Sequence, residues 1–178
     1  MISRNTTTRK DKMRNEIGTY DAYQETVEKL GGGGLLLASG EKGNPMAIGW
    51  ATIGITWGRP MFIVLVRPSR YTFGLIEECG EFVVDVPTND LKKEVALCGS
   101  KSGRDIDKIK ECNFTLEKGN TISVPYIKEC SIHYECRVVH KSNVINADLA
   151  HEIVQQFYPS GDFHRVYYGQ ILGVYRES

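Results

Sequence analysis

Short apolar stretches separated by turn residues dominate the first half of this chain. Three of them are Leu35–Ser39, Met46–Thr56 and Met61–Val66, and the turn-forming segments Gly40–Asn44 and Trp57–Pro60 lie between them. Apolar runs of this length between glycine-, asparagine- and proline-containing turns are typical of antiparallel strands that follow one another as a meander. The pattern therefore predicts a mainly β fold.

The remainder of the chain adds further strands and several short helices. Strands are predicted at Phe82–Val86, Ile132–Val139 and Arg165–Tyr175. Helices are predicted at Ile17–Leu30, Pro68–Glu78, about Asp90–Cys98, Asp105–Cys112 and about Asp148–Gln156, with a loop at Ser100–Gly103. These helices are too few and too unevenly placed to connect parallel strands through βαβ units. We therefore expect an antiparallel barrel or sandwich with peripheral helices.

The length and the charge of the chain bound its class. It has 178 residues, the size of one domain, and 41% of them are hydrophobic, which is too many for intrinsic disorder. The N-terminal segment is polar and basic, so residues 1–16 are predicted as a flexible arm and residues 17–178 as a single domain. With 22 basic and 22 acidic residues, the chain lacks the basic excess of proteins that bind nucleic-acid phosphates.

The apolar runs and the cysteines bear on the compartment. The runs near Leu35–Ala38 and Phe62–Val66 are far shorter than the ~20 residues of a membrane-spanning helix, so no membrane segment is expected. The N-terminal residues lack the apolar core of a secretory signal. Five dispersed cysteines cannot all pair, which favours reduced thiols and a cytoplasmic protein.

A cysteine–histidine run in the second half of the chain resembles a zinc-binding set by residue type only. It consists of Cys130, His133, Cys136 and His140. The flanking alternation makes this segment a strand, which places Cys130 and Cys136 about 20 Å apart at ~3.3 Å per residue. Two thiolates on one zinc ion at ~2.3 Å cannot be so far apart, so no metal site is expected.

The segment Arg67–Thr72 stands where a strand ends and a helix begins. Ser69 is a suitable N-cap residue, and the first backbone amides of the helix are free to face an anion. The hydroxyls of Ser69 and Thr72 and the charges of Arg67 and Arg70 favour a phosphate at this place. An ordinary capped helix with two surface arginines is the alternative interpretation.

Two other segments have the composition of ligand-binding loops. In Cys98–Asp105, two glycines permit close backbone approach, and Ser100, Lys101 and Ser102 could contact a second face of the same anion. A polar loop between two helices is the alternative there. Glycines beside Trp50 suggest that a flat aromatic ligand lies against that strand, although a tightly packed barrel corner would also explain them.

Catalytic groups are not evident from the residue pattern. There is no Gly-x-Ser-x-Gly elbow, and no cysteine is marked as activated by a histidine. Among the four histidines, His164 stands at a loop–strand junction, where functional groups often lie. A surface histidine is the simpler interpretation of His164, and no residue is predicted as a general acid or base.

Four segments in this order resemble the flavin reductase-like, flavoredoxin-type family of FMN-binding split-barrel proteins. They are Asn44–Thr52, Arg67–Thr72, Gly80–Pro87 and Cys98–Asp105, and the resemblance covers roughly residues 35–175. It implies an antiparallel six-stranded split barrel, a homodimer, and one FMN per subunit near the dimer interface. Two positions depart from the family pattern: Ala47 replaces a frequent threonine, and Phe163 separates Asp162 from His164.

The resemblance also implies which residues bind the cofactor. The FMN-binding residues would be Met46, Ala47, Gly49, Trp50, Ala51, Thr52, Arg67, Ser69, Arg70, Thr72, Ser100, Lys101 and Ser102. His164 would lie near the flavin and any nicotinamide. The function expected from the resemblance is that of an FMN-dependent oxidoreductase, which passes electrons between NAD(P)H or a protein donor and an acceptor. A non-catalytic FMN-binding electron carrier and a barrel that binds another phosphate-bearing ligand are the alternatives.

Overall fold

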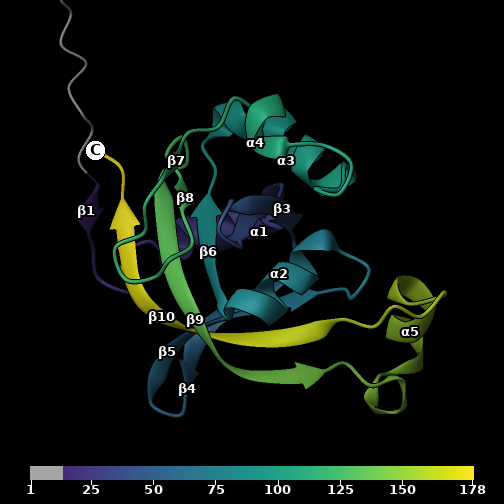
Figure 1. Cartoon of the computed structure of the whole chain (residues 1–178). Helices are drawn as coiled ribbons and strands as arrows, with labels where there is room; N and C mark the ends of the chain where they lie inside the picture. Colours follow the sequence, from purple (N-terminus) through teal and green to yellow (C-terminus); the bar gives the residue numbers. More distant parts are fainter. Residues whose placement is uncertain (1–13) are drawn as a thin grey trace, which may run out of the picture.

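One antiparallel sheet organises residues 14–178, which are the residues that the computed structural model describes (Figure 1). Within them the sheet has eight strands in the order β3–β2–β6–β9–β10–β5–β4, with β1 paired to β10. The bounds are β1 Asn15–Glu16, β2 Leu35–Ser39, β3 Asn44–Ile48, β4 Ala51–Thr56, β5 Arg59–Val66, β6 Glu81–Val86, β9 Ile132–Asn143 and β10 Arg165–Arg176. Two short strands that were not predicted, β7 Leu116–Glu117 and β8 Tyr126–Ile127, form a separate hairpin.

The two end strands of this order, β3 and β4, are consecutive in the chain. Gly49 and Trp50 separate them, and each strand pairs with a different neighbour, β3 with β2 and β4 with β5. The prediction of one continuous strand over Met46–Thr56 is therefore wrong, because the chain leaves the hydrogen-bonded ladder at these two residues and crosses from one sheet edge to the other. The mainly β, antiparallel class is confirmed, with eight strands rather than six.

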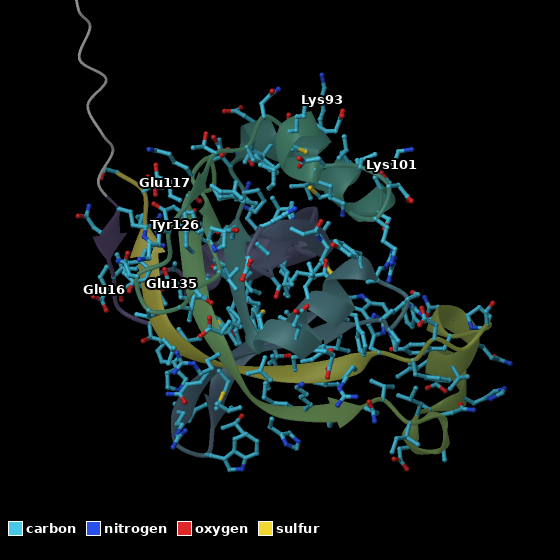
Figure 2. All side chains as sticks on the ribbon, in the orientation of Figure 1. Glu16, Lys93, Lys101, Glu117, Tyr126 and Glu135 are labelled. Carbon is cyan, nitrogen blue, oxygen red and sulfur yellow. The ribbon has the colours of Figure 1, made fainter. Side chains whose placement is uncertain are left out.

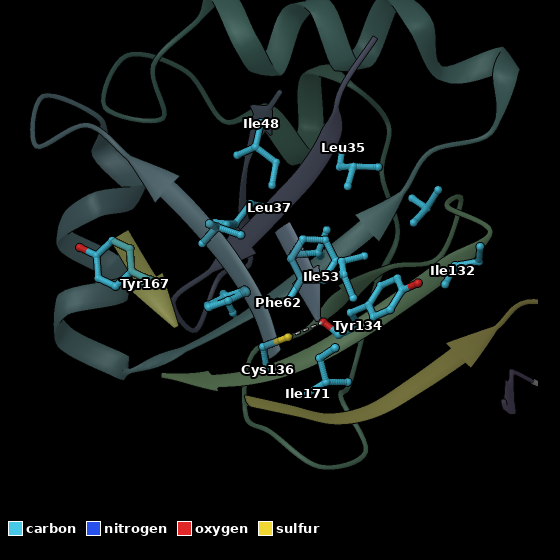
Figure 3. Close-up of a cluster of buried hydrophobic side chains, with 14 of the residues drawn as sticks. Leu35, Leu37, Ile48, Ile53, Phe62, Ile132, Tyr134, Cys136, Tyr167 and Ile171 are labelled. Atoms are coloured by element: carbon cyan, nitrogen blue, oxygen red, sulfur yellow. Dashed lines mark hydrogen bonds between the residues drawn. The ribbon is translucent and has the colours of Figure 1, made fainter. Parts of the chain in front are cut away.

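The barrel core and a second core lie on opposite faces of β2, whose five residues are all buried. Leu35 and Leu37 point into the barrel with Phe62 and Tyr134 (Figure 3). Leu36 points the other way and packs with buried residues of α3 and of the segment after α4. Successive side chains of a strand face opposite sides, so an uninterrupted apolar run indicates a strand covered on both faces.

Most of the helices pack around β2 and β3. Their bounds are α1 Tyr23–Gly32, α2 Tyr71–Cys79, η1 Asn89–Leu91, α3 Lys92–Ser100, α4 Lys108–Glu111, η2 Asn146–Asp148 and α5 His151–Phe157. Helix α5 stands beyond the barrel, where β9 and β10 extend together (Figure 1). Helix α4 is shorter than the predicted Asp105–Cys112 because Asp107 caps it, accepting hydrogen bonds from the amides of Ile109 and Lys110.

The first helix also differs from its prediction at both ends. A turn in which the Gly18 amide donates to Asp21 at 2.8 Å precedes it, so the helix begins at Tyr23 instead of Ile17. It ends at Gly32, two residues beyond the predicted Leu30, so the first two of the four consecutive glycines 31–34 are helical. Only the last of them, Gly34, has a φ of +100°, the region where glycine is favoured.

The N-terminal segment joins the fold earlier than expected. Of the predicted arm over residues 1–16, residues 1–13 lie outside the described part of the chain, whereas Asn15 and Glu16 form β1 against β10. Arg14 lies between the Tyr126 and Tyr175 rings and forms an ion pair with Glu135. Figure 2 shows Glu16, Tyr126 and Glu135 gathered at this edge of the barrel.

Candidate flavin site at the split of the barrel

The turn between β5 and α2 carries the first predicted cluster. The Arg70 amide closes this turn on the Arg67 carbonyl at 3.0 Å, and Arg70 is the N-cap residue of α2. The N-cap predicted at Ser69 is therefore wrong by one position. The Ser69 hydroxyl instead donates to Asp162 Oδ2 at 2.6 Å, and the Ser69 amide donates to Asp162 Oδ1 at 3.3 Å.

The Arg67 guanidinium group contacts the segment that follows α5. It donates to the carbonyl oxygens of Phe157 at 2.7 Å and Asp162 at 2.9 Å, and it lies over the Tyr158 ring at 4.9 Å from the centroid. These contacts use the planar, multiple-donor geometry of arginine. Arg67 therefore holds residues 157–162 against the end of β5, and its hydrogen bonds already go to carbonyl oxygens.

A cavity of about 200 Å³ opens beside this turn, at the edge where β3 gives way to β4. Seven predicted site residues line it, namely Met46, Ala47, Gly49, Trp50, Arg67, Arg70 and His164, and they are joined by Ile48 and Leu65. In the described part of the chain, the exposed Arg70 side chain has no hydrogen-bond or ion-pair partner. A Cβ built on Gly49 would meet no atom within 4 Å, so the cavity is open at this residue.

His164 is buried at the wall of this cavity, and the simpler interpretation of a surface histidine is wrong. His164 is 8% exposed, and its Nδ1 is 2.7 Å from the Tyr158 hydroxyl. Burial lowers the pKa of His164 to about 4, and the positive charge of Arg67 acts in the same direction. The imidazole ring is therefore neutral at neutral pH.

Aromatic side chains from α5 and the loop after it form the wall around His164. The Trp50 ring lies 5.0 Å from Phe157 in an edge-to-face arrangement and 4.9 Å from His164. Tyr158 stacks on Phe163 at 4.7 Å. Pairs of this geometry stabilise one another beyond their buried area, so the end of α5 and the β3–β4 connection fix each other's position.

The segment Cys98–Asp105, the second predicted ligand-binding segment, packs beside the start of α2. Arg104 Nη1 donates to the Ser69 carbonyl at 3.0 Å, and a Cβ on Gly103 would lie 2.6 Å from a carbon of the Tyr71 ring. The hydroxyl of Ser100, however, donates to the Ala96 carbonyl within α3 at 2.9 Å. The Ser102 hydroxyl accepts from the Arg104 amide at 3.2 Å.

Lys101 is the cation that this loop leaves uncommitted. It is exposed, it projects from the end of α3 in Figure 2, and no described residue pairs with it. Lys101 does not line the cavity, so in the described residues Arg70 is the uncommitted cation at the cavity itself.

Three other predicted residues do not line the cavity. Thr72 is buried in α2, and its hydroxyl accepts a hydrogen bond from Asn44 Nδ2 at 2.9 Å, which ties α2 to β3. Ala51 and Thr52 lie on β4, beyond the break in the strand. The strand expected to run from Met46 to Thr52 along one ligand is divided by that break, so only its first part reaches the cavity.

Sequence reasoning missed the roles of Tyr158 and Asp162. Both lie in the irregular segment after α5, and their contacts are with residues far away in the chain, such as the Asp162–Ser69 pair with a separation of 93 positions. The one local signal is Gly161 before Asp162. Both residues have positive φ, +76° and +56°, which marks a tight reversal that aims Asp162 at the α2 turn.

The residues of the apparent zinc set are dispersed into different environments. His133 Nδ1 lies 2.7 Å from Asp85 Oδ1 inside the sheet, and Cys136 is in the barrel core. His140 is exposed and contacts the Trp57 and Tyr168 rings edge-to-face. Residues 14–178 contain no group of three or more His, Cys, Asp or Glu side chains placed to hold a metal ion. None of their helices is long and apolar enough to span a membrane.

Known proteins with a similar sequence or structure point to one family. The family model "Flavin reductase like domain" matches residues 28–178. An uncharacterized protein of Archaeoglobus fulgidus is 41% identical over 127 residues, which are 71% of this chain and 69% of that protein. Flavoredoxin from Methanosarcina acetivorans has a TM-score of 0.64 and 30% identity, with 82% of this chain and 68% of that chain covered.

A more distant structure agrees in fold. The FMN-binding domain of a flavin reductases-like enzyme from Shewanella baltica OS155 has a TM-score of 0.66 at 20% identity, covering 94% of this chain and 78% of that chain. The predicted split-barrel class is confirmed by these neighbours. The family model supports FMN, the cofactor predicted with that class. The chain belongs to the flavin reductase-like family.

Proposed function

We propose that this protein is an FMN-binding oxidoreductase of the flavin reductase-like type, which passes electrons between NAD(P)H or a protein donor and an acceptor. The observation that carries the proposal is the cavity at the split of the barrel, where the β3 end, Arg70 and the aromatic wall around His164 meet. Family membership supports the cofactor.

The residues at this cavity fit FMN. Arg70, which lines the cavity and is uncommitted in the described residues, would hold the phosphate, and the backbone from Met46 to Trp50 would lie beside the ring. Lys101, which lies outside this lining, would reach the phosphate from the end of α3. The volume of about 200 Å³ is below the ~300–1,000 Å³ of most small-molecule sites, so the cavity would enclose only part of the cofactor. Bound FMN would supply the redox chemistry, while this chain's residues bind and orient it.

The absorbance spectrum of the purified protein tests the proposal. We expect a flavin band, either as isolated or after addition of FMN, and loss of that band on anaerobic mixing with NADH or NADPH. Protein that takes up no FMN at high micromolar concentration would contradict the cofactor assignment. If neither NADH nor NADPH reduces the bound flavin, the proposal that the protein accepts electrons from NAD(P)H is wrong.

A second candidate function is electron transfer without a small-molecule substrate. It is favoured by His164, the histidine that lines the cavity: its Nδ1 already pairs with Tyr158, and burial lowers its pKa to about 4, so at neutral pH it carries no extra proton to donate. In that case the bound flavin would be reduced by dithionite or by a redox protein, but not by either nicotinamide.

The predicted homodimer remains part of this proposal. In its support, β4 ends the sheet order and carries Ile55, which is 70% exposed, next to Trp57, which is 63% exposed. An edge strand with exposed apolar side chains is a suitable surface for a second copy. Sedimentation analysis should show a dimer that Ile55→Lys weakens, whereas a monomer in the unmodified protein would contradict the homodimer.

The predicted cytoplasmic location is likewise proposed, because the five cysteines are unpaired.

A further inference from the structure

The carboxylate of Asp162 lies at the place where the sequence predicts a ligand phosphate. It accepts hydrogen bonds from both donors of Ser69, the hydroxyl at 2.6 Å and the backbone amide at 3.3 Å. A serine hydroxyl has one proton to donate. Ser69 therefore has no donor left for a phosphate while this contact exists.

Asp162 is held in this position by its own backbone and by Arg67. Asp162 has a φ of +56° and follows Gly161 at +76°, a reversal that turns the side chain toward α2. Arg67 donates to the Asp162 carbonyl at 2.9 Å and to the Phe157 carbonyl at 2.7 Å, on either side of the reversal. The backbone of Asp162 is thus held in place, and its exposed carboxylate reaches Ser69 from that position.

The charges around the turn give this contact a consequence for ligand choice. Arg67 and Arg70 both line the cavity, and the Asp162 carboxylate adds a negative charge at Ser69, which lies between these two arginines in the turn. A phosphate monoester carries a charge of about −1.5 to −2 at neutral pH. A phosphate brought to Ser69 would meet a like charge and lose the hydroxyl donor, whereas the neutral terminal hydroxyl of riboflavin would meet no like charge.

We propose that Asp162 is a specificity-determining residue that weakens the binding of phosphorylated flavin relative to unphosphorylated flavin by occupying Ser69. This inference rests on the proposed flavin site. It implies that FMN binds through Arg70 and Lys101 with moderate affinity, as suits a flavin that exchanges with solution instead of remaining permanently bound.

The test compares FMN and riboflavin binding in Asp162→Asn and in a control. Asparagine has nearly the same shape and tolerates positive φ, so the reversal should persist while the charge is lost. The control, Asp148→Asn, removes an equal charge from an exposed residue of η2 that has no contact with the α2 turn. Fluorescence quenching at fixed ionic strength gives both dissociation constants.

We expect Asp162→Asn to bind FMN at least tenfold more tightly, with riboflavin affinity within twofold of the unmodified protein and Asp148→Asn unchanged for both. A ratio of FMN to riboflavin affinity that changes by less than twofold would overturn the proposal. So would an equal change in Asp148→Asn, because it would show a general charge effect.

Ser69→Ala supplies a second variant that does not depend on the Asp162 substitution folding well. If Asp162 occupies Ser69, removing the hydroxyl should change FMN affinity in the unmodified background by less than twofold and should reduce the gain in Asp162→Asn. A loss of tenfold or more with Ser69→Ala alone would mean that Ser69 binds the phosphate directly, and would overturn the proposal.

Inorganic phosphate separates this proposal from the flavin assignment. If the unmodified protein bound neither flavin, the proposed function would fail. The competition between Asp162 and a phosphate anion for Ser69 would still be measurable by thermal shift with potassium phosphate. We expect phosphate to raise the melting temperature of Asp162→Asn more than that of the unmodified protein or Asp148→Asn. Equal shifts in all three proteins would overturn the competition itself.

Discussion

At the scale of single residues, burial determines the charge of His164. Burial, with the Arg67 charge, lowers its pKa from 6.5 to about 4, so the unfolded chain takes up a proton at a pH where the folded protein does not. A folded-state pKa below the unfolded value means that stability falls as pH decreases from 6.5 to 4. We expect His164 to account for a loss of roughly 2–3 kcal/mol of unfolding free energy between pH 7 and pH 4.

Urea unfolding at the two pH values, for the unmodified protein and His164→Gln, measures this contribution. Several carboxylates with lowered pKa values, such as Glu77 and Glu81, also lose stabilising charge as the pH falls. The relevant quantity is therefore the difference in pH-dependent unfolding free energy between the unmodified protein and His164→Gln. His164→Gln should be the less pH-sensitive protein. Identical pH dependence in both would contradict a buried, neutral His164.

At the scale of an element, helix α2 contains two glycines with opposite requirements. Gly80 is the C-terminal cap with φ +66°, whereas Gly74 is an exposed position in the helix interior. An added Cβ would meet no atom within 4 Å at either position, so packing does not distinguish them. Gly80→Ala should destabilise the protein by about 1 kcal/mol through backbone strain, and Gly74→Ala should stabilise it by up to about 1 kcal/mol.

Thermal or urea unfolding of these two variants decides the matter, because each serves as the control for the other. Changes of the same sign would show that the conformation at Gly80 is not what requires glycine there. The local pattern was sufficient to predict a reversal at Trp57–Pro60, because such a signal depends on neighbouring residues alone. Trp57 and Gly58 in that reversal both have positive φ, as a tight hairpin turn requires.

The features that sequence reasoning missed depend on distant residues. The break at Gly49 and Trp50 is set by the different neighbours of β3 and β4, and an apolar run contains no information on pairing partners. The Ser69 hydroxyl goes to Asp162, 93 positions away, in place of the local cap. The cluster of Arg67, Arg70 and the β3 end was predicted through the family motifs, whereas the segment after α5 that closes the site was not.

At the scale of the whole molecule, the two ends of the described chain are joined at one barrel edge. Strand β1 pairs with the last strand, β10, and Arg14 reaches Glu135 near the start of β9. Glu135 is fully buried. Burial opposes its ionisation, but hydrogen bonds from Thr121, Asn120 and Arg14 outweigh that effect and keep its pKa below the usual value. Arg14 is therefore part of the folded domain and compensates a buried charge.

Arg14→Gln should consequently lower the unfolding free energy by about 3 kcal/mol, because loss of one partner leaves a buried carboxylate with fewer donors. Arg137→Gln is the matched control: Arg137 lies on the same strand as Glu135, but its ion pair with Glu81 is solvent-exposed, and its loss should cost less than about 1 kcal/mol. Urea unfolding at pH 7 compares the two. If Arg14→Gln loses no more unfolding free energy than Arg137→Gln, the domain does not depend on its N-terminal strand. A larger loss for Arg14→Gln would extend the folded unit to Arg14, into the segment that the sequence predicted as a flexible arm.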